Sequence, residues 1–451
     1  MYPRILIAAL LAAGVTAQAD SDERTLQPAD IFDLEYALNP QVSPDGERIA
    51  YVRHSMDIMT DQALGNIWIV DNDGDNHRPL LSGTDSYSSP RWSPDGEQLL
   101  YVSSAGARGA ELHMRWMDTG QTALLSNLPE GPGSISWSPD GQYIAFQMFV
   151  ETDGLKLTDP PAMPEGAEWA TPVKVIDDMP YRADGAGYLE TGYTHLFVIP
   201  ADGGTPRQLT TGDYNHGGPL SWTPDGNHIL FSANRIDNPI NDPLESELWS
   251  VAVDSGELTQ LTDRNGPDFA PAVSPDGERA AYLGFDDKGL ANHEIDAYLL
   301  DRESGEVRLL SGDFDRDVGS IEWLGGSRRL LISYDDRGKT KIARMSLDGA
   351  VSDIVDDVGS ASVGRPYTSG SLSVSNDGAI AYTRGTPLRP SEVGYIGNRG
   401  PARTLTNLND DLFAQRTPGS VEEITWQSSV GDYEIQGWIV KPHDFDASKQ
   451  Y

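Results

Sequence analysis

The sequence lacks several residue types, and each absence excludes a class of function. It contains no cysteine, which excludes disulfides, thiol catalysis and thiolate metal sites. Positive charge is scarce: 33 Lys and Arg stand against 69 Asp and Glu, and the net charge is −36. Nucleic acid and anionic membrane surfaces both need basic residues for binding. The composition therefore disfavours both as partners.

Motifs of common catalytic sites are missing as well. The 451 residues contain no Gly-x-Ser-x-Gly elbow, no His-Glu-x-x-His pair and no glycine-rich phosphate loop that opens a helix. The eight His are scattered without metal-ligand spacing. We therefore predict no catalytic residue, no metal ligand and no cofactor within this sequence.

Long hydrophobic runs are absent except at the N-terminus. Arg4 is followed by an apolar run over residues 5–15, and small residues then lead to Ala19. The run is too short to span a bilayer, and the pattern is typical of a secretory signal peptide. We predict that residues 1–19 are cleaved after Ala19, and that the mature chain is periplasmic or secreted without a membrane anchor.

A short turn motif is abundant and orders the chain. Copies of Ser-Pro-Asp-Gly, or close variants, begin at residues 43, 93, 138, 223, 274, 324 and 375, so the steps are 50, 45, 85, 51, 50 and 51 residues. Ser can bond the turn backbone, Pro pre-sets φ, and Gly accepts the open conformation. A short apolar run rich in β-branched and aromatic residues follows each turn and indicates a strand.

Four strands in about 50 residues is the pattern of a β-propeller blade. The repeats predict an all-β, seven-bladed propeller of four-stranded blades over residues 38–410, after a leader at 20–37. Chance turns in a two-sheet sandwich would not explain the near-constant spacing. The strands of each blade are contiguous in sequence, so we expect the ring to close by packing between its first and last blades.

The 85-residue step marks an insertion in the third blade, at about residues 151–193. Long insertions between the strands of a regular scaffold are often functional. We predict substrate binding there by four side chains that offer charge and hydrogen bonds, Arg182, Asp184, Tyr188 and Glu190. The alternative is a surface loop that pads the rim, in which Arg182 and Asp184 pair with each other.

Two segments resemble known functional sites, a calcium-binding loop and an oxyanion-hole loop. Residues 71–76 resemble the start of a calcium loop, but Gly is missing at the sixth place and Ser82 stands where the bidentate Glu belongs. We interpret them as a hairpin turn. Residues 216–219, His-Gly-Gly-Pro, resemble an oxyanion-hole loop that has no nucleophile beside it. We interpret them as an inter-blade loop.

The pattern changes after the repeats. Residues 421–427 and 433–440 alternate as two strands around a turn at 430–432, and Pro442 then breaks the second strand. A two-stranded piece is not stable alone. We therefore expect the opening of another sheet.

The turn repeats and these terminal strands together resemble the prolyl oligopeptidase family of serine peptidases. A more specific resemblance, to the acylaminoacyl-peptidase and bacterial dipeptidyl-peptidase branch, is carried by residues 182–188, 195–197 and 263–267. The resemblance covers nearly everything from about residue 26 onward. It implies a propeller that sits over an α/β-hydrolase domain and admits only short or unfolded peptides to a Ser-Asp-His triad. It also implies that residues 411–451 are a linker and the first strands of a truncated hydrolase domain.

None of the family's triad positions has a counterpart in these 451 residues. We therefore expect the substrate-gating propeller of an exported serine peptidase, inactive by itself, with peptide substrates reached through the hydrolase domain. The alternative is a stand-alone periplasmic propeller that serves as a protein-interaction scaffold. A third hypothesis, a propeller polysaccharide lyase or glycosidase, would require charged side chains that converge in the pore.

Overall fold

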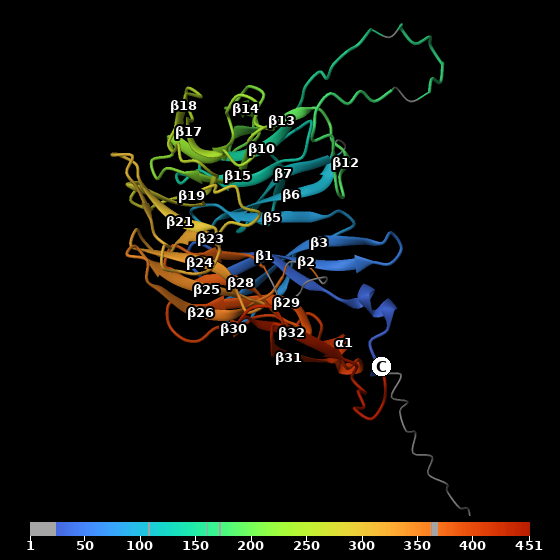
Figure 1. Ribbon diagram of the computed structural model, residues 1–451. Helices are drawn as coiled ribbons and strands as arrows, with labels where there is room; N and C mark the ends of the chain where they lie inside the picture. Colours follow the sequence, from blue (N-terminus) through green and yellow to red (C-terminus); the bar gives the residue numbers. More distant parts are fainter. Residues whose placement is uncertain (1–23, 107–108, 160, 171–172, 361, 363–368) are drawn as a thin grey trace, which may run out of the picture.

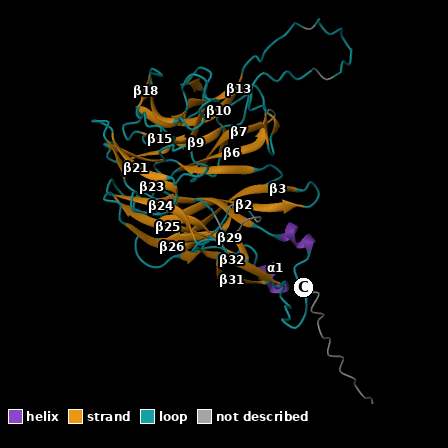
Figure 2. Cartoon of the chain, in the orientation of Figure 1, coloured by secondary structure: helices purple, strands orange, loops and turns teal. Residues whose placement is uncertain are grey.

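The computed structural model describes residues 24–451 except 107–108, 160, 171–172, 361 and 363–368. The predicted signal peptide and its cleavage site therefore lie outside the described residues. Nearly all regular structure is β, apart from a 3-10 helix, η2 (Pro28–Asp33), and one short helix, α1 (Asp410–Gln415) (Figure 2). Within the described part of the chain, no helix has the length and apolar character that a membrane crossing needs.

Five of the described sheets have four antiparallel strands each (Figure 1). The first two are formed by β1 (Tyr36–Val42), β2 (Arg48–Asp57), β3 (Gln62–Asp71) and β4 (Arg78–Leu81), and by β5 (Tyr87–Trp92), β6 (Gln98–Gly106), β7 (Gly109–Trp116) and β8 (Thr122–Leu124). The third is formed by β9 (Gly133–Trp137), β10 (Tyr143–Glu151), β13 (Gly192–Pro200) and β14 (Arg207–Gln208). The next two are formed by β15 (His216–Trp222), β16 (His228–Ala233), β17 (Glu247–Ala252) and β18 (Leu258–Gln260), and by β19 (Asp268–Val273), β20 (Arg279–Gly284), β21 (Asp296–Asp301) and β22 (Val307–Leu309).

An eight-stranded sheet follows and contains two groups of four strands. They are β23 (Val318–Trp323), β24 (Arg329–Asp336), β25 (Lys339–Ser346) and β26 (Val351–Val358), and then β27 (Leu372–Val374), β28 (Ile380–Thr386), β29 (Arg389–Ile396) and β30 (Arg403–Thr404). The two groups are joined by the pair Val358–Arg384. Two small hairpins complete the structure, β11 (Arg182–Ala183) with β12 (Gly187–Tyr188), and β31 (Ser420–Gln427) with β32 (Glu434–Lys441).

The second strand of each group carries a continuous buried run instead of an alternating one. Residues 49–52 of β2, 144–148 of β10 and 229–233 of β16 are all buried. A strand shows a continuous buried run when neighbouring layers cover both faces of its sheet. Each sheet is therefore enclosed between the sheets before and after it.

Hydrophobic cores join neighbouring sheets, and one of them joins the last sheet to the first. That core contains Val42 and Tyr51 from the first sheet and Ala381 and Val393 from the last. The backbone N–H of Asn376 also donates to the carbonyl of Pro44 at 3.2 Å. The sheets therefore close into a ring. As expected, closure among the described strands rests on packing, without an exchanged strand.

The turn motif has the chemistry that its residues predict. Ser93 Oγ donates to Asp95 Oδ1 at 2.5 Å and accepts from the Gln98 N–H at 2.9 Å, while Gly96 has φ +73°. The hydroxyl-to-carboxylate bond recurs at Ser43, Ser138, Thr223, Ser274 and Ser375. The bond from Ser93 lowers the pKa of Asp95, because it stabilises the ionised carboxylate.

A Trp precedes four of the seven motif turns, and in three of them it ties neighbouring sheets together. The indole N–H donates to a backbone carbonyl on the first strand of the preceding sheet: Trp92 to Gln41 at 2.9 Å, Trp137 to Arg91 at 3.3 Å and Trp323 to Ala272 at 2.8 Å. The motif therefore closes its own hairpin and also sets the position of one sheet relative to the next.

Antiparallel connectivity gives the ring two different faces. The motif turns join the first strand of each group to the second, and they all lie on one side, which we call the motif face. Turns between the second and third strands, and connections from one sheet to the next, lie on the other side, which we call the open face. The insert at 152–191 joins second and third strands, so it rises from the open face (Figure 1).

Candidate functional site

A cavity of about 760 Å³ opens on the open face of the ring. Its walls come from loops around β21, β23, β24 and β27. Carboxylates outnumber the one Arg side chain in its lining: Glu294, Asp315, Asp317, Glu322 and Asp335 against Arg316. A site with this imbalance of charge holds a negative potential, which favours positively charged groups.

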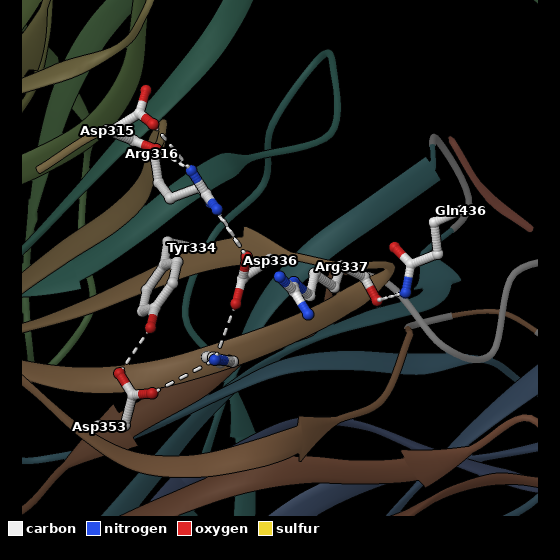
Figure 3. A network of polar contacts seen from close by, with 8 residues as sticks. Asp315, Arg316, Tyr334, Asp336, Arg337, Asp353 and Gln436 are labelled. Carbon is white, nitrogen blue, oxygen red and sulfur yellow. Dashed lines mark hydrogen bonds and ion pairs between the residues drawn. The ribbon is translucent and has the colours of Figure 1, made fainter. Parts of the chain in front are cut away.

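A polar network fixes the rim of this cavity (Figure 3). Arg316 Nε donates to Asp336 Oδ1 at 3.0 Å, and Lys341 Nζ donates to Asp336 Oδ2 at 2.9 Å. The hydroxyl of Tyr334 donates to Asp353 Oδ1 at 2.5 Å, and Lys341 also reaches Asp353. The hydrogen bond from Lys341 leads in lowering the pKa of Asp336, so that carboxylate stays ionised at the rim.

The same rim contacts the hairpin β31–β32. Gln436 Nε2 donates to the carbonyl of Arg337 at 3.4 Å, in the turn between β24 and β25. Gly338, the next residue, has φ +70°, and a Cβ there would lie 2.3 Å from the indole of Trp438. Only glycine fits both the backbone conformation and this contact. The hairpin therefore lies against the open face, beside the cavity.

A second cavity, of about 750 Å³, adjoins the first and shares Glu322 and Leu372 with it. Arg91 lines this second cavity, and its Nη1 donates to Asn39 Oδ1 at 3.3 Å. Glu322 is accessible from the cavities but surrounded by protein, and this surrounding raises its pKa despite the nearby charge of Arg91. The first strands of four groups, β1, β5, β23 and β27, contribute to this second cavity. They bring the acid Glu322 and the base Arg91 together there.

The four residues that the sequence predicted for substrate binding do not line one cavity together. Arg182, Asp184 and Tyr188 lie exposed on the β11–β12 hairpin, where Arg182 is the register partner of Tyr188. No ion pair between Arg182 and Asp184 occurs among the described residues. Lys174 instead connects the other two, because its Nζ lies 3.8 Å from Glu190 and 4.9 Å from the ring of Tyr188.

A third cavity, of about 600 Å³, lies between the insert and the open-face end of the third sheet. Of the four predicted residues, Glu190 lines it, whereas Arg182, Asp184 and Tyr188 do not. The insert also contributes lining residues that the sequence interpretation did not select, among them Ile176, Asp178 and Tyr181. The prediction of substrate binding by the four residues stays a prediction.

Sequence reasoning missed a second repeated pair, on the open face. An acid at or beside the start of a third strand accepts from a Ser or Thr hydroxyl near the end of the fourth: Glu111 from Ser126 at 2.5 Å, Glu247 from Thr262 at 2.6 Å, Asp296 from Ser311 at 2.5 Å and Glu392 from Thr406 at 2.6 Å. Burial raises the pKa of Glu247 to about 7. A search for an acid followed by a hydroxyl residue 14 or 15 positions later would have found these pairs.

The two segments that resemble known functional sites, residues 71–76 and 216–219, have structural roles. Residues 71–76 lie at the β3–β4 turn, where the Asp71 N–H donates to the Asp75 carbonyl at 3.0 Å. No group of three or more His, Asp or Glu that could hold a metal occurs within the described residues.

The interpretation of residues 216–219 as an inter-blade loop is wrong, because they begin the inner strand β15. His216 is buried there, and its ring bonds the Thr194 carbonyl at 3.0 Å and Arg235 Nη1 at 2.5 Å. Burial lowers the pKa of His216 to about 4. The sequence missed this because a bulge between Gly217 and Ser221 lets the two glycines remain within the strand.

Comparisons with known proteins fit this architecture. The family model of the dipeptidyl peptidase IV N-terminal region matches residues 185–282. An uncharacterized peptidase, YuxL, of Bacillus subtilis is 28% identical over 438 residues, which are 94% of this chain and 64% of the relative. Dipeptidyl-peptidase 5 of Porphyromonas gingivalis is 22% identical over 443 residues, which are 94% of this chain and 62% of that relative. The chain thus spans less than two thirds of either relative.

Solved structures show the same fold. An acylaminoacyl peptidase of Pyrococcus horikoshii superimposes with a TM-score of 0.69 at 19% identity, over 91% of this chain and 58% of that one. The β-propeller domain of the trilobed protease from Pyrococcus furiosus gives a TM-score of 0.57 at 16% identity, over 84% of this chain and 98% of that domain. Together, the family match and the relatives support the resemblance found in the sequence, to peptidases of the prolyl oligopeptidase family, and the solved structures show that the chain has the fold of their propeller portion.

Proposed function

We propose that this chain is the substrate-gating propeller of an exported serine peptidase that hydrolyses short peptides. In this proposal, hydrolysis takes place in an α/β-hydrolase domain of which residues 411–451 supply the linker and first strands, and the 451 residues alone are inactive. The peptidase names of the relatives support this function.

The observation that carries the proposal is the hairpin β31–β32. Trp438, Ile439 and Val440 follow one another on β32 and are 46%, 40% and 74% exposed. Successive side chains on a strand point to opposite faces, so both faces of this hairpin are apolar. A strand that is apolar on both faces belongs inside a sheet covered on both sides, as in α/β domains. Such a sheet would begin on the open face, beside the acidic cavity.

We propose seven blades for the ring. The five separate four-stranded sheets and the two halves of the eight-stranded sheet support this number. So do the hydrophobic cores: six of them draw their residues from two consecutive groups of strands, and the seventh joins the first group to the last. In a closed ring, the first strand of each group would then lie around a central channel, which the two adjoining cavities form.

Gating would depend on the two adjoining cavities, which meet at Glu322. A passage of this kind excludes folded proteins by size, whereas an extended peptide can enter. The excess of carboxylates in the first cavity, of about 760 Å³, would favour peptides that carry positive charge. Both effects act before chemistry, so they should change the KM of a peptide more than kcat.

The proposal is tested by comparing this chain with a longer product of the same coding region. The 451-residue chain and the chain extended through the downstream reading frame are assayed with short chromogenic peptides and with a serine-reactive fluorophosphonate probe. We expect hydrolysis and labelling from the extended chain alone.

N-terminal sequencing of the exported protein should show the mature chain starting at Asp20.

Two results would contradict the proposal. A stop codon directly after Tyr451 would instead favour the stand-alone interaction scaffold. An extended chain that degrades polysaccharide but cleaves no peptide would favour the lyase or glycosidase hypothesis, which needs the convergence of charge seen near Arg91 and Glu322.

A further inference from the structure

We propose that the 600 Å³ cavity between the insert and the third sheet is a binding subsite for a peptide segment in which an apolar side chain stands beside a positively charged one. This inference rests on the proposed function to the extent that peptides are the ligands. It places the binding role of the insert at its root, against the third sheet, and not on the β11–β12 hairpin.

The root of the insert is held in a defined shape. The Thr152 N–H donates to the Thr191 carbonyl at 2.9 Å, where the two arms of the insert leave the sheet. Further out, the Leu189 N–H donates to the Tyr181 carbonyl at 2.9 Å. Gly192 cannot carry a side chain, since its Cβ would lie 2.3 Å from the carbonyl of Val150. The cavity is thus bounded by paired backbone on the sheet side.

The cavity is lined by apolar and aromatic side chains that the described chain leaves partly exposed. Ile176, Tyr181 and Leu189 line it and are 50%, 46% and 37% exposed. Phe149 and Tyr193 line it from β10 and β13. Apolar surface gathered in one hollow gains stability when a ligand removes it from water. This part of the cavity fits an apolar side chain.

The charged groups around these apolar residues are mostly acidic. The carboxylates in the lining are Glu130, Glu151, Asp177, Asp178 and Glu190, and Lys174 is the basic residue among them. Lys174 is already engaged by Glu190 and by the ring of Tyr188. Burial raises the pKa of Tyr193, and the charges of Asp213 and Asp178 add to the shift, which places negative potential beside the aromatic wall.

Charge complementarity decides between the possible occupants. A second copy of this chain would bring a net charge of −36 to an acidic cavity, and an anionic ligand would meet the same repulsion. A purely apolar segment would leave the surrounding carboxylates without a partner. A basic residue next to an apolar one satisfies both parts of the lining.

Binding is measured by fluorescence anisotropy with labelled tripeptide amides at low salt. The probes are acetyl-Lys-Phe-Lys-amide, acetyl-Glu-Phe-Glu-amide and acetyl-Lys-Gly-Lys-amide, whose blocked ends exclude recognition of a free terminal amine. We expect Lys-Phe-Lys to bind about tenfold more tightly than either of the other two, because only it satisfies the apolar and the acidic parts together. Salt at 0.5 M should reduce the difference from Glu-Phe-Glu.

Matched variants locate the site. The double variant Glu151→Gln, Asp178→Asn should lose about tenfold in affinity for Lys-Phe-Lys, since it removes two carboxylates from the lining. Asp153→Asn is the control, because Asp153 is 86% exposed on the same insert and does not line the cavity. Both variants should keep the circular dichroism spectrum and the thermal midpoint of the parent chain.

Equal affinity for the three probes would overturn the inference. Equal affinity for the two Lys probes, or an equal loss in Asp153→Asn, would also overturn it and would assign binding to the general acidity of the chain. The result is independent of catalysis. Specific binding without peptidase activity in the extended chain would retain the subsite and refute the proposed function. Peptidase activity without specific binding would refute the subsite and retain the proposed function.

Discussion

The two faces of the ring are built on different principles. On the motif face, six of the seven turns repeat the same hydroxyl-to-carboxylate bond, and Gly in the same conformation closes them. On the open face, the described connections range from a two-residue turn at Arg337–Gly338 to the insert at 152–191. The regular face specifies the fold, while the face with connections of unequal length holds two of the cavities, the insert and the terminal hairpin.

The difference also concerns how stability is distributed. The motif face uses many short, local bonds near water, and each contributes modestly. The open face also includes interactions between buried charges, such as Arg264 with Asp268, and there the loss of one partner leaves the other uncompensated. Three sets of substitutions test this contrast, in decreasing order of their expected effect.

The largest effect is expected from Asp268→Ala on the open face. The side chain of Asp268 is fully buried, at 0% exposure, and forms an ion pair with Arg264. Its removal leaves a largely desolvated guanidinium with less compensation, so the free energy of unfolding should fall by about 3 kcal/mol in urea denaturation. The control is Asp286→Ala, the 60% exposed partner of the same Arg264 at 2.8 Å, which should cost less than about 1 kcal/mol. Equal effects of the two substitutions would remove the distinction between buried and exposed pairs.

An intermediate effect is expected from Ser274→Ala on the motif face. The hydroxyl donates to Asp276 at 2.6 Å and accepts from the Arg279 N–H at 3.0 Å. Loss of both bonds in one repeated turn, at about 1 kcal/mol each, should lower the free energy of unfolding by about 2 kcal/mol. Ser304→Ala removes a similar bond to Asp301 in an exposed turn and should cost less than about 0.5 kcal/mol. A loss as large as that of Asp268→Ala would show that the repeated turns are not individually weak.

The smallest effect on the ring is expected where the hairpin β31–β32 meets it. Gly338→Ala introduces a Cβ that clashes with Trp438, and Gly289→Ala is the matched control, since Gly289 also has positive φ but nothing within 4 Å of its Cβ position. Both should lose about 1 kcal/mol through backbone strain. Only Gly338→Ala should speed hydrogen exchange in residues 434–441, by about tenfold. Unchanged exchange there would mean that the Gly338–Trp438 contact does not hold the hairpin.

Much of the fold could be predicted because its signals are local. The turn motif spans five residues, and its Ser, Asp and Gly act on one another within that span. The strands at 421–427 and 433–440 were confirmed as β31 and β32 for the same reason. The error at residues 216–219 arose where a glycine pair, which usually indicates a loop, lies in a bulged strand.

The candidate sites could not be predicted in the same way. Arg91 and Glu322 are 231 positions apart in the numbering, and only the order of strands around the ring brings them to adjoining cavities. Glu190 and Tyr188 are two residues apart, yet only Glu190 lines the insert cavity. Which side chains of an irregular loop face inward depends on the sheet that the loop returns to.

By itself, the sequence determined the repeat, the four strands in each unit, the closing chemistry of the turns, and the change of pattern after the ring. These follow from residues a few positions apart, whose bonds form in any copy of the turn. The tertiary structure alone decided where the cavities lie, which charges meet in them, and where the hairpin contacts the rim. Those properties depend on how different strands and loops pack against one another, and the local sequence of one segment does not encode the side chains of the segment that it meets.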